Sequence, residues 1–375
     1  MYCCPNCLNQ DRKYFAIKNG EIYCRKCISF SGENVKKENL KSKEVILKLD
    51  YELSDLQREI SYKVLDGFKN KKNVLIKAVC GAGKTELVYD TIKYALQKHL
   101  KVGFAIPRKD VVIDLFPRLK QAFPNQKVIS IYGGNHKELN GDIIVLTTHQ
   151  LFRFNNYFDL LIMDEIDAFP YKGSDLLENF FKKSLRGNFI LMSATASDDL
   201  ILKMKQESGE VFFLDKRYHN HLLPVPINKT FLFGKLFYLF FLLKKYKKNH
   251  LPVLVFTPTI NKCERLFKQC FLVPNGNYVH SRVEDRNQII DDFKKGRYSF
   301  LITTSILERG VTIRNLQVVV FNAHHSIYDA NTLIQIAGRV GRKIDAFTGE
   351  VVFIADYITE EMQNAIKEIN RANTS

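Results

Sequence analysis

The residues best suited to phosphate chemistry lie in one short segment, Ala78-Val79-Cys80-Gly81-Ala82-Gly83-Lys84-Thr85. This segment follows the apolar run 74–76 and precedes a helical pattern over residues 86–96. Small residues ahead of a helix let backbone N–H groups surround a polyphosphate, and Gly81, Ala82 and Gly83 would form that loop. Lys84 would reach the β- and γ-phosphates, and the Thr85 hydroxyl would bind Mg²⁺. The segment therefore predicts a nucleotide site, with ATP as the expected ligand.

Two carboxylates that could act on a bound nucleotide follow the apolar run 160–163. Asp164 can hold Mg²⁺ through its water shell, and Glu165 can orient and deprotonate an attacking water molecule. An acidic pair at the end of a buried strand, downstream of a phosphate loop, predicts hydrolysis as well as binding. Thr85 and Asp164 are therefore the expected magnesium ligands, and Lys84 and Glu165 the expected catalytic groups.

Two arginines in the C-terminal half, Arg339 and Arg342, are three residues apart on or beside a predicted helix, so both can point the same way. Arginines that a second domain supplies to a triphosphate would stabilise the transferring phosphoryl group only when the two domains close. The alternative is a pair of surface arginines in salt bridges.

Four cysteines near the N-terminus form two C-x-x-C pairs, Cys4 with Cys7 and Cys24 with Cys27. The residues between the pairs read as a hairpin with an Asn-Gly turn. This spacing predicts a zinc ribbon with a tetrahedral four-sulfur site that stabilises a module too small to fold alone. Cys3 could replace Cys4 as a ligand. Redox-active or free thiols are the alternatives to zinc, and whether the module contacts DNA or a partner is left open.

Short apolar runs that alternate with helical patterns predict an α/β protein with parallel sheets, in which ligands bind beyond the carboxyl ends of the strands. The runs after residue 76 are 102–106, 128–131, 142–146, 160–163 and 189–192, then 253–257, 278–280, 300–304, 318–321 and 351–354. The expected organisation is a zinc ribbon at 1–40, a linker at 41–52, a first domain at 53–215, a connection at 216–228 and a second domain at 229–375.

Composition points to a polyanionic partner. The 375 residues carry a formal net charge of +16, with a pI of about 9.3, and nucleic acid is the commonest polyanion that such proteins bind. The chain starts without a basic segment followed by an apolar one, so we expect a cytoplasmic protein. The apolar segment 231–243 is too short to cross a bilayer and reads as a buried helix, with an interfacial role as a lesser alternative.

The combined motifs resemble the tandem RecA-like core of superfamily-two helicases of the DEAD/DEAH type. The matching segments are 78–85, 164–167, 193–195, 304–312 and 335–342. Segments 106–112, 117–119, 147–151, 164–170 and 306–312 resemble the ComFA family more specifically, the ATPases of bacterial DNA uptake, which also carry an N-terminal four-cysteine module. The resemblance covers nearly the whole chain. Cys80, where threonine or serine is common, is a departure from the pattern.

This resemblance implies two RecA-like domains behind a zinc ribbon, and ATP-driven movement along single-stranded DNA at the inner face of the cell membrane. It also implies a ComFC-type partner protein and the DNA-uptake channel. Gln57 would contact adenine, and Gly310 and Gln335 would lie at the nucleotide. Residues expected to contact the DNA backbone, without reading bases, are Pro107, Arg108, Thr147, Thr148, His149, Thr257, Pro258, Thr303 and Thr304.

Three other functions remain open from the sequence. A PriA-like replication-restart helicase shares related motifs, although such proteins are longer and carry their cysteines inside the helicase region. A nucleic-acid-binding remodeller would use ATP only to switch its affinity. An RNA helicase of the same superfamily is the third, and the cysteine module argues against it.

Overall fold

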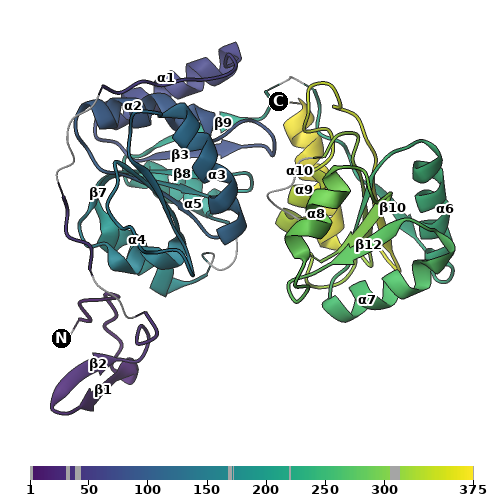
Figure 1. Ribbon diagram of the computed structural model, residues 1–375, viewed down its shortest axis with the longest axis horizontal. Helices are drawn as coiled ribbons and strands as arrows, with labels where there is room; N and C mark the ends of the chain where they lie inside the picture. The colour runs from purple at the N-terminus through teal and green to yellow at the C-terminus, as the bar shows by residue number, and fades with distance from the viewer. Residues whose placement is uncertain are drawn as a thin grey trace. The chain divides into compact units, whose positions relative to one another are not determined.

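The computed structural model describes residues 3–30, 34–38, 44–167, 171, 173–218, 221–304 and 313–374 (Figure 1). The chain divides into two compact units. The first comprises Met1–Ala78 with Gly83–Leu214, and the second comprises Val79–Ala82 with Asp215–Ser375. Each unit is built on its own parallel sheet, which confirms the predicted fold class.

The N-terminal cysteines lie on and around a small hairpin. Strands β1 (Phe15–Lys18) and β2 (Glu21–Cys24) pair antiparallel, after a 3₁₀ turn η1 (Arg12–Tyr14). Asn19 and Gly20 join the strands with φ values of 52° and 83°. Positive φ at both positions is what a type I′ hairpin turn requires, so Asn-Gly explains the turn.

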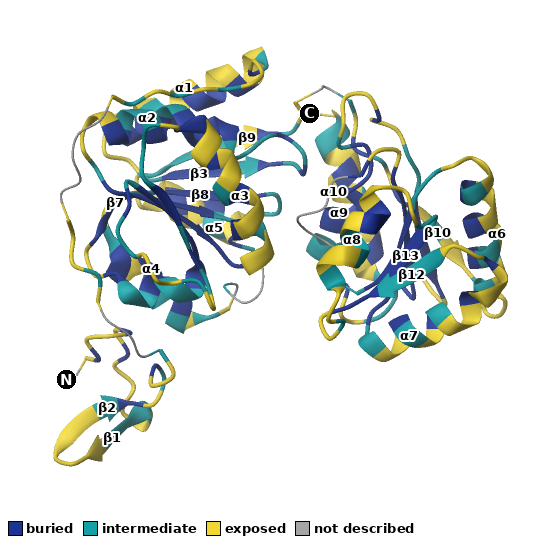
Figure 2. Ribbon diagram, in the orientation of Figure 1, coloured by how far each residue is buried: buried dark blue, intermediate teal, exposed yellow. Residues whose placement is uncertain are grey.

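The first unit contains a seven-stranded sheet in the order β5-β6-β4-β7-β8-β3-β9, with every pair parallel. The strands are β3 (Val74–Ala78), β4 (Val102–Ile106), β5 (Val128–Ile131), β6 (Ile143–Thr147), β7 (Phe158–Asp164), β8 (Leu185–Ser193) and β9 (Glu210–Leu214). The helical segments are α1 (Asp55–Lys69), η2 (Glu86–Val88), α2 (Tyr89–Gln97), α3 (Lys109–Ala122), η3 (Thr148–Arg153), α4 (Asp175–Ser184) and α5 (Asp198–Gln206). Figure 2 shows the central strands in the dark blue of buried residues.

The second unit repeats this plan with six parallel strands in the order β10-β15-β14-β11-β13-β12. They are β10 (Ile227–Thr230), β11 (Val253–Phe256), β12 (Gly276–Val279), β13 (Phe300–Thr303), β14 (Gln317–Phe321) and β15 (Val351–Ala355). The helical segments are α6 (Lys235–Lys248), α7 (Ile260–Gln269), η4 (Cys270–Leu272), α8 (Arg286–Lys294), α9 (Ala330–Ala337) and α10 (Glu360–Thr374).

Two strands, β9 and β10, were not predicted from the sequence. Each lies at an edge of its sheet, and in each most residues are exposed or half-buried. An edge strand buries less of its surface than a central strand, and β10 carries no continuous apolar run. Strand β9 does contain one, residues 211–214, but periodicity alone cannot assign so short a run to a strand or a helix. The central strands all appeared where apolar runs predicted them.

Helix α6 corrects one interpretation, because it is not buried all round. Leu239, Leu242 and Leu243 are in the core, whereas Phe237 is 77% exposed and Phe241 is 60% exposed. The structure confirms the helix and contradicts its burial on that one face. Among the described residues, no helix combines the length and apolarity that a membrane crossing requires.

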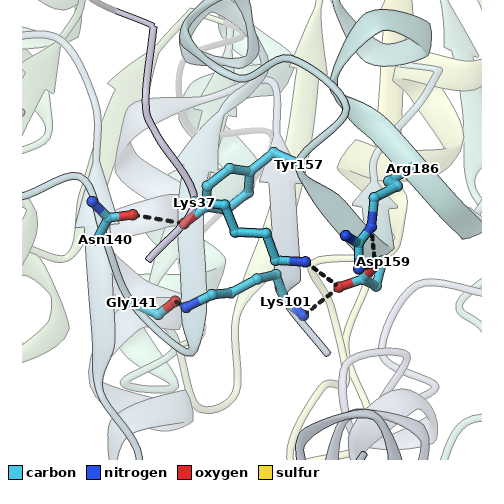
Figure 3. A network of polar contacts seen from close by, with 7 residues as sticks. All are labelled: Lys37, Lys101, Asn140, Gly141, Tyr157, Asp159 and Arg186. Carbon is cyan, nitrogen blue, oxygen red and sulfur yellow. Dashed lines mark hydrogen bonds and ion pairs between the residues drawn. The ribbon is translucent and has the colours of Figure 1, made fainter. Parts of the chain in front are cut away.

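A buried carboxylate anchors the segment that precedes the first sheet. Asp159, near the start of β7, accepts hydrogen bonds from the Lys101 backbone N–H at 2.9 Å and from Lys37 Nζ at 3.1 Å. Arg186 on β8 forms an ion pair with the other carboxylate oxygen (Figure 3). The Lys101 side chain in turn donates to the Gly141 carbonyl at 3.2 Å. This network lies at the start of the strands, the edge opposite Asp164.

We predict that Asp159→Ala lowers the free energy of unfolding by roughly 2–3 kcal/mol, because it leaves a lysine, an arginine and a backbone N–H without their shared acceptor. The measurement is urea denaturation of the full chain. Glu59→Ala removes an exposed carboxylate from an i,i+4 pair with Lys63 and should cost at most about 0.5 kcal/mol. Equal losses in the two variants would contradict the anchoring role.

Candidate functional site

The carboxyl edge of the first sheet gathers the predicted nucleotide residues. The phosphate loop follows β3, Asp164 ends β7 and Ser193 ends β8. Strand β8 pairs with both β3 and β7, so these three strand ends are consecutive along one edge. Parallel sheets bind their ligands at this edge.

The loop itself has a conformation that depends on glycine. Gly81 and Gly83 have φ values of 84° and 76°, a region that residues with a Cβ rarely adopt. A Cβ on Gly83 would lie 2.5 Å from Gln57 Nε2. Lys84 folds back over the loop, with Nζ at 3.4 Å from the Ala78 carbonyl. The helix expected from residue 86 starts as the 3₁₀ turn η2, and α2 begins only at Tyr89.

Gln57 reaches this loop through the start of helix α1. Ser54 caps the helix, and its side chain accepts from the Gln57 backbone N–H, while Gln57 Oε1 accepts from the Ser54 N–H at 3.0 Å. This reciprocal capping box fixes the Gln57 side chain. The structure therefore brings Gln57 to Gly83, and its contact with adenine remains a prediction.

Asp164 has a shifted pKa, and Glu165 has an uncommon backbone conformation. Burial raises the pKa of Asp164 to about 6, and the positive charge of Lys84 opposes that rise. Asp164 Oδ1 accepts from the Glu165 backbone N–H at 2.8 Å. Glu165 has a φ of 57°, and a non-glycine residue in this region carries backbone strain of the kind found at functional sites.

Asp167 is a polar residue at this edge to which sequence reasoning gave no role. Its carboxylate accepts from Ser193 Oγ at 2.9 Å and from Thr195 Oγ1 at 2.6 Å. The acidic segment after β7 is thus tied directly to the hydroxyl segment after β8. Both segments were recognised as motifs from the sequence, but the hydrogen bonds that join them were not predicted.

Glu86 was also missed. This buried carboxylate follows the phosphate loop directly and accepts from Tyr51 Oη at 2.7 Å. Arg118 on α3 forms an ion pair with the same oxygen. These contacts fix η2, the turn through which the loop enters its helix. A glutamate after Lys84-Thr85 carries no sequence signal for such pairing.

The predicted DNA-contact residues of the first half lie on the same edge. Ile106 at the end of β4 pairs with Thr147 at the end of β6, so Pro107 and Arg108 come next to the segment that begins at Thr147. Pro107, Thr147 and Thr148 are buried, whereas Arg108 and His149 are half-buried. Burial lowers the pKa of His149. Side-chain contact with DNA is therefore open mainly to Arg108 and His149.

The second sheet repeats this pairing, since Phe256 at the end of β11 is opposite Thr303 at the end of β13. The Thr257 hydroxyl donates to the Thr303 carbonyl at 3.1 Å, and both threonines and Pro258 are buried. Thr304 is half-buried. Residues 305–312, with the expected nucleotide residue Gly310, lie outside the described part of the chain.

The arginine motif begins at the end of helix α9, which stops at Ala337 with Gly338 as its C-cap. Gln335 is in the helix and is buried. Arg339 and Arg342 both follow the helix and differ in environment, because Arg339 is buried and Arg342 is half-buried. Arg342 Nε donates to the Gly338 carbonyl at 2.9 Å.

The four predicted metal ligands are clustered. The sulfurs of Cys4, Cys7, Cys24 and Cys27 all lie within 4.8 Å of one another. Two of these separations, Cys4 to Cys27 and Cys7 to Cys24, are 3.7 Å. A tetrahedral site with Zn–S bonds of about 2.3 Å separates its sulfurs by about 3.8 Å. The donor set therefore fits zinc, and it uses Cys4, since Cys3 is exposed.

The cysteine module, residues 3–30, packs against the first sheet's helices. Phe30 stacks on His149 with ring centroids 6.1 Å apart and contacts Phe180 edge-on at 5.1 Å. Lys26 pairs with Asp175 at 3.5 Å. The four cysteines belong to the same buried cluster as the first unit's apolar residues. The module is thus in direct contact with a predicted DNA-contact residue.

Comparison with known protein families matches both sheets to helicase-type domains. Residues 50–198 match the family described as type III restriction enzyme, res subunit, and residues 234–343 match the helicase conserved C-terminal domain. Among solved structures, Dbp5 of Saccharomyces cerevisiae bound to RNA and ADP-BeF3 has a TM-score of 0.62 at 18% identity, covering 86% of this chain and 92% of Dbp5. The helicase Lhr of Mycobacterium smegmatis bound to single-stranded DNA and AMP-PNP has a TM-score of 0.63 at 17% identity, covering 85% of this chain and 50% of Lhr. These likenesses establish the fold.

Two curated relatives match almost the entire chain. The competence protein ComFA of Bacillus subtilis is 32% identical over an alignment 403 positions long, which covers 99% of this chain and 86% of the relative. ComFA of Streptococcus pneumoniae is 32% identical over an alignment 398 positions long, which covers 99% of this chain and 90% of the relative. With two parallel sheets, a phosphate loop beside an acidic strand end and a four-cysteine module, the chain belongs to the ComFA family and is a superfamily-two enzyme of the ATPase/helicase class.

Proposed function

We propose that this protein is an ATP-driven translocase on single-stranded DNA that handles incoming DNA during natural competence. The observation that carries the proposal is the shared carboxyl edge of the first sheet. Along that edge the strand order β6-β4-β7-β8-β3 runs from the predicted DNA-contact residues to the phosphate loop without interruption. Nucleotide and DNA would therefore bind to neighbouring loops at the edge of one sheet.

The hydrolytic step follows from the chemistry of the edge residues. Mg²⁺-bound ATP supplies the phosphoanhydride bond that is cleaved. Lys84 would neutralise charge on the β- and γ-phosphates, while Thr85 and Asp164 would hold the metal. Glu165 accepts a proton from the attacking water. Arg339 and Arg342 of the second unit stabilise charge that develops on the transferring phosphoryl group.

Coupling to DNA runs through the contact between the two motifs after β7 and β8. Asp167 holds both Ser193 and Thr195, so a displacement of the acidic segment would be passed directly to the hydroxyl segment. Buried threonines at the predicted DNA positions favour contact through backbone groups, which suits binding without base recognition. The net charge of +16 favours a polyanionic strand.

The family membership supports the remaining parts of the proposal. We place the protein in the cytoplasm, at the inner face of the cell membrane, with a ComFC-type partner and the DNA-uptake channel. Zinc in the cysteine module would stabilise the Phe30 contact with His149 and hence the segment after β6.

We predict that Lys84→Ala lowers ATP turnover by about 100-fold or more while single-stranded DNA binding changes little, because the lysine is proposed to act on the phosphates of ATP and not on DNA. DNA-stimulated ATPase assays and fluorescence anisotropy with labelled oligonucleotides give the two readouts. Lys63→Ala, an exposed lysine of α1, is the matched control. Near-normal turnover in Lys84→Ala would overturn the scheme.

Directional movement distinguishes a motor from a switch. The proposal requires ATP-dependent displacement of a blocking protein from single-stranded DNA, whereas an affinity switch would show ATP-dependent binding without net movement. Stronger ATPase stimulation by RNA than by single-stranded DNA would favour an RNA helicase.

A second prediction concerns Asp164→Asn, which should abolish turnover and raise the melting temperature of metal-free, nucleotide-free protein at pH 8 by roughly 2–5 °C. The raised pKa of about 6 means that the folded state favours the protonated acid. Stability from this group is therefore complete at low pH and is lost as pH rises through about 6. A lower melting temperature for the variant at pH 8 would show that pairing with Lys84 outweighs burial.

A third prediction is that purified protein holds about one zinc ion per chain, and that Cys24→Ser loses it whereas Cys3→Ser keeps it. Elemental analysis gives the metal content, and limited proteolysis of residues 1–40 gives the fold of the module. Chelation should expose these residues to cleavage because the module has little core of its own. Protection that survives complete zinc removal would contradict a structural metal.

A further inference from the structure

Arg217 is a fully buried arginine with no part in the steps above. It lies just after β9, in the connection between the two sheets, and is 1% exposed. It is one of the two largest fully buried side chains among the described residues, and the other is Arg339. A buried guanidinium is costly unless its donors are satisfied, so the contacts of Arg217 identify what it stabilises.

Its contacts converge on the loop that carries the two motif arginines. Arg217 Nη1 donates to the Val340 carbonyl at 2.8 Å and to the Gly341 carbonyl at 2.6 Å. Nη2 donates to the Gly338 carbonyl at 3.3 Å. Nε donates to the Cys80 carbonyl at 3.2 Å, within the segment Val79–Ala82 of the same compact unit.

Helix geometry explains one of these bonds. Gly338 is the C-cap of α9, and its carbonyl lies at the negative end of the helix dipole. The Val340 and Gly341 carbonyls lie beyond the helix, in the loop itself. An arginine presents five donors in a fixed fork, so one side chain can satisfy several carbonyls. Burial lowers the pKa of Arg217 to about 10, with the nearby charge of Arg342 adding to the effect, so the group stays charged at pH 7.

The loop is held tightly around these bonds. Gly341 has a φ of 69°, and a Cβ there would lie 2.3 Å from the Phe347 carbonyl and 2.9 Å from Arg217 Nη1. Tyr218, the next residue, donates from Oη to the Arg342 carbonyl at 3.1 Å. The bonded carbonyls at 338 and 340 flank Arg339, and those at 341 and 342 fix the backbone of Arg342.

We propose that Arg217 is a positioning residue that fixes the backbone of residues 338–342 and thereby aims Arg339 and Arg342 for ATP hydrolysis. The inference rests on the proposed roles of those two arginines. Every nitrogen of Arg217 is committed to a carbonyl, so it acts through the loop and not on phosphate itself. A displacement of about 1 Å in such a group can cost about 100-fold in rate.

The test compares three variants in full-length protein. Arg217→Met keeps much of the volume and removes all donors, and should lower kcat at saturating ATP by about 30-fold or more while the KM for ATP changes less than about 3-fold. Arg217→Lys keeps the charge without the fork and should fall between wild type and Arg217→Met. Leu242→Ala, a buried residue of α6 away from the loop, destabilises the same unit and should retain kcat within about 2-fold below its melting temperature.

A double-mutant cycle separates positioning from general damage. If Arg217 acts through the motif arginines, Arg217→Met should add less than about 3-fold to the defect of Arg342→Lys or of Arg339→Lys. If the fold-losses in kcat of the two single variants multiply fully in the double variant, the inference is overturned. An effect on KM alone would also overturn it, because it would indicate that Arg217 acts through its bond to the Cys80 carbonyl. If Arg339→Lys and Arg342→Lys both keep normal kcat, the proposed catalytic role of these two arginines is wrong. A loss of kcat in Arg217→Met would then contradict the proposal that Arg217 acts by positioning them.

Discussion

Parallel strands all end at the same edge of a sheet, and the arrangement of this molecule depends on that constraint. In the first sheet it brings the ends of β3, β7 and β8 together, and with them the start of the phosphate loop, Asp164 and Ser193. The same rule places Thr147 beside Ile106. Parallel strand pairing alone therefore brings together residues that are more than a hundred positions apart in the sequence. The second unit applies the rule again at β11 and β13.

Charged side chains then hold the loops that leave these strands. Glu86 fixes the turn after the phosphate loop, Asp167 joins the segments after β7 and β8, and Arg217 binds the carbonyls after α9. Each satisfies several partners with one charged group, which makes the buried charges of Glu86 and Arg217 tolerable. Asp159 does the same at the opposite edge, where it anchors the segment around Lys37. Rigid loops of this kind suit an enzyme whose groups must be aligned before the reaction.

The cysteine module packs against the rest of the first unit. Phe30 lies between His149 and Phe180, and the cysteines share the buried cluster of that unit. The match to the two ComFA relatives extends over 99% of the chain, so it includes the module as well as both sheets. The contacts of Phe30 with His149 and Phe152 of η3 give the module a physical connection to the segment that begins at Thr147.

The sequence alone determined the local chemistry and the kind of fold. Continuous apolar runs predicted the central strands, and Asn19-Gly20 predicted the hairpin. Spacing identified the phosphate loop and the cysteine pairs. Strand β10 was not predicted because it has no apolar run, and β9 because its run is too short to distinguish a strand from a helix. Helix α6 was interpreted as buried because its exposed phenylalanines are of a residue type common in cores. Only tertiary structure chose Cys4 over Cys3, turned Thr257 and Thr303 inward, and brought Arg217 to the loop of Arg339. Those outcomes depend on which groups meet across the fold and satisfy each other's hydrogen bonds, and no local pattern in the chain encodes such meetings.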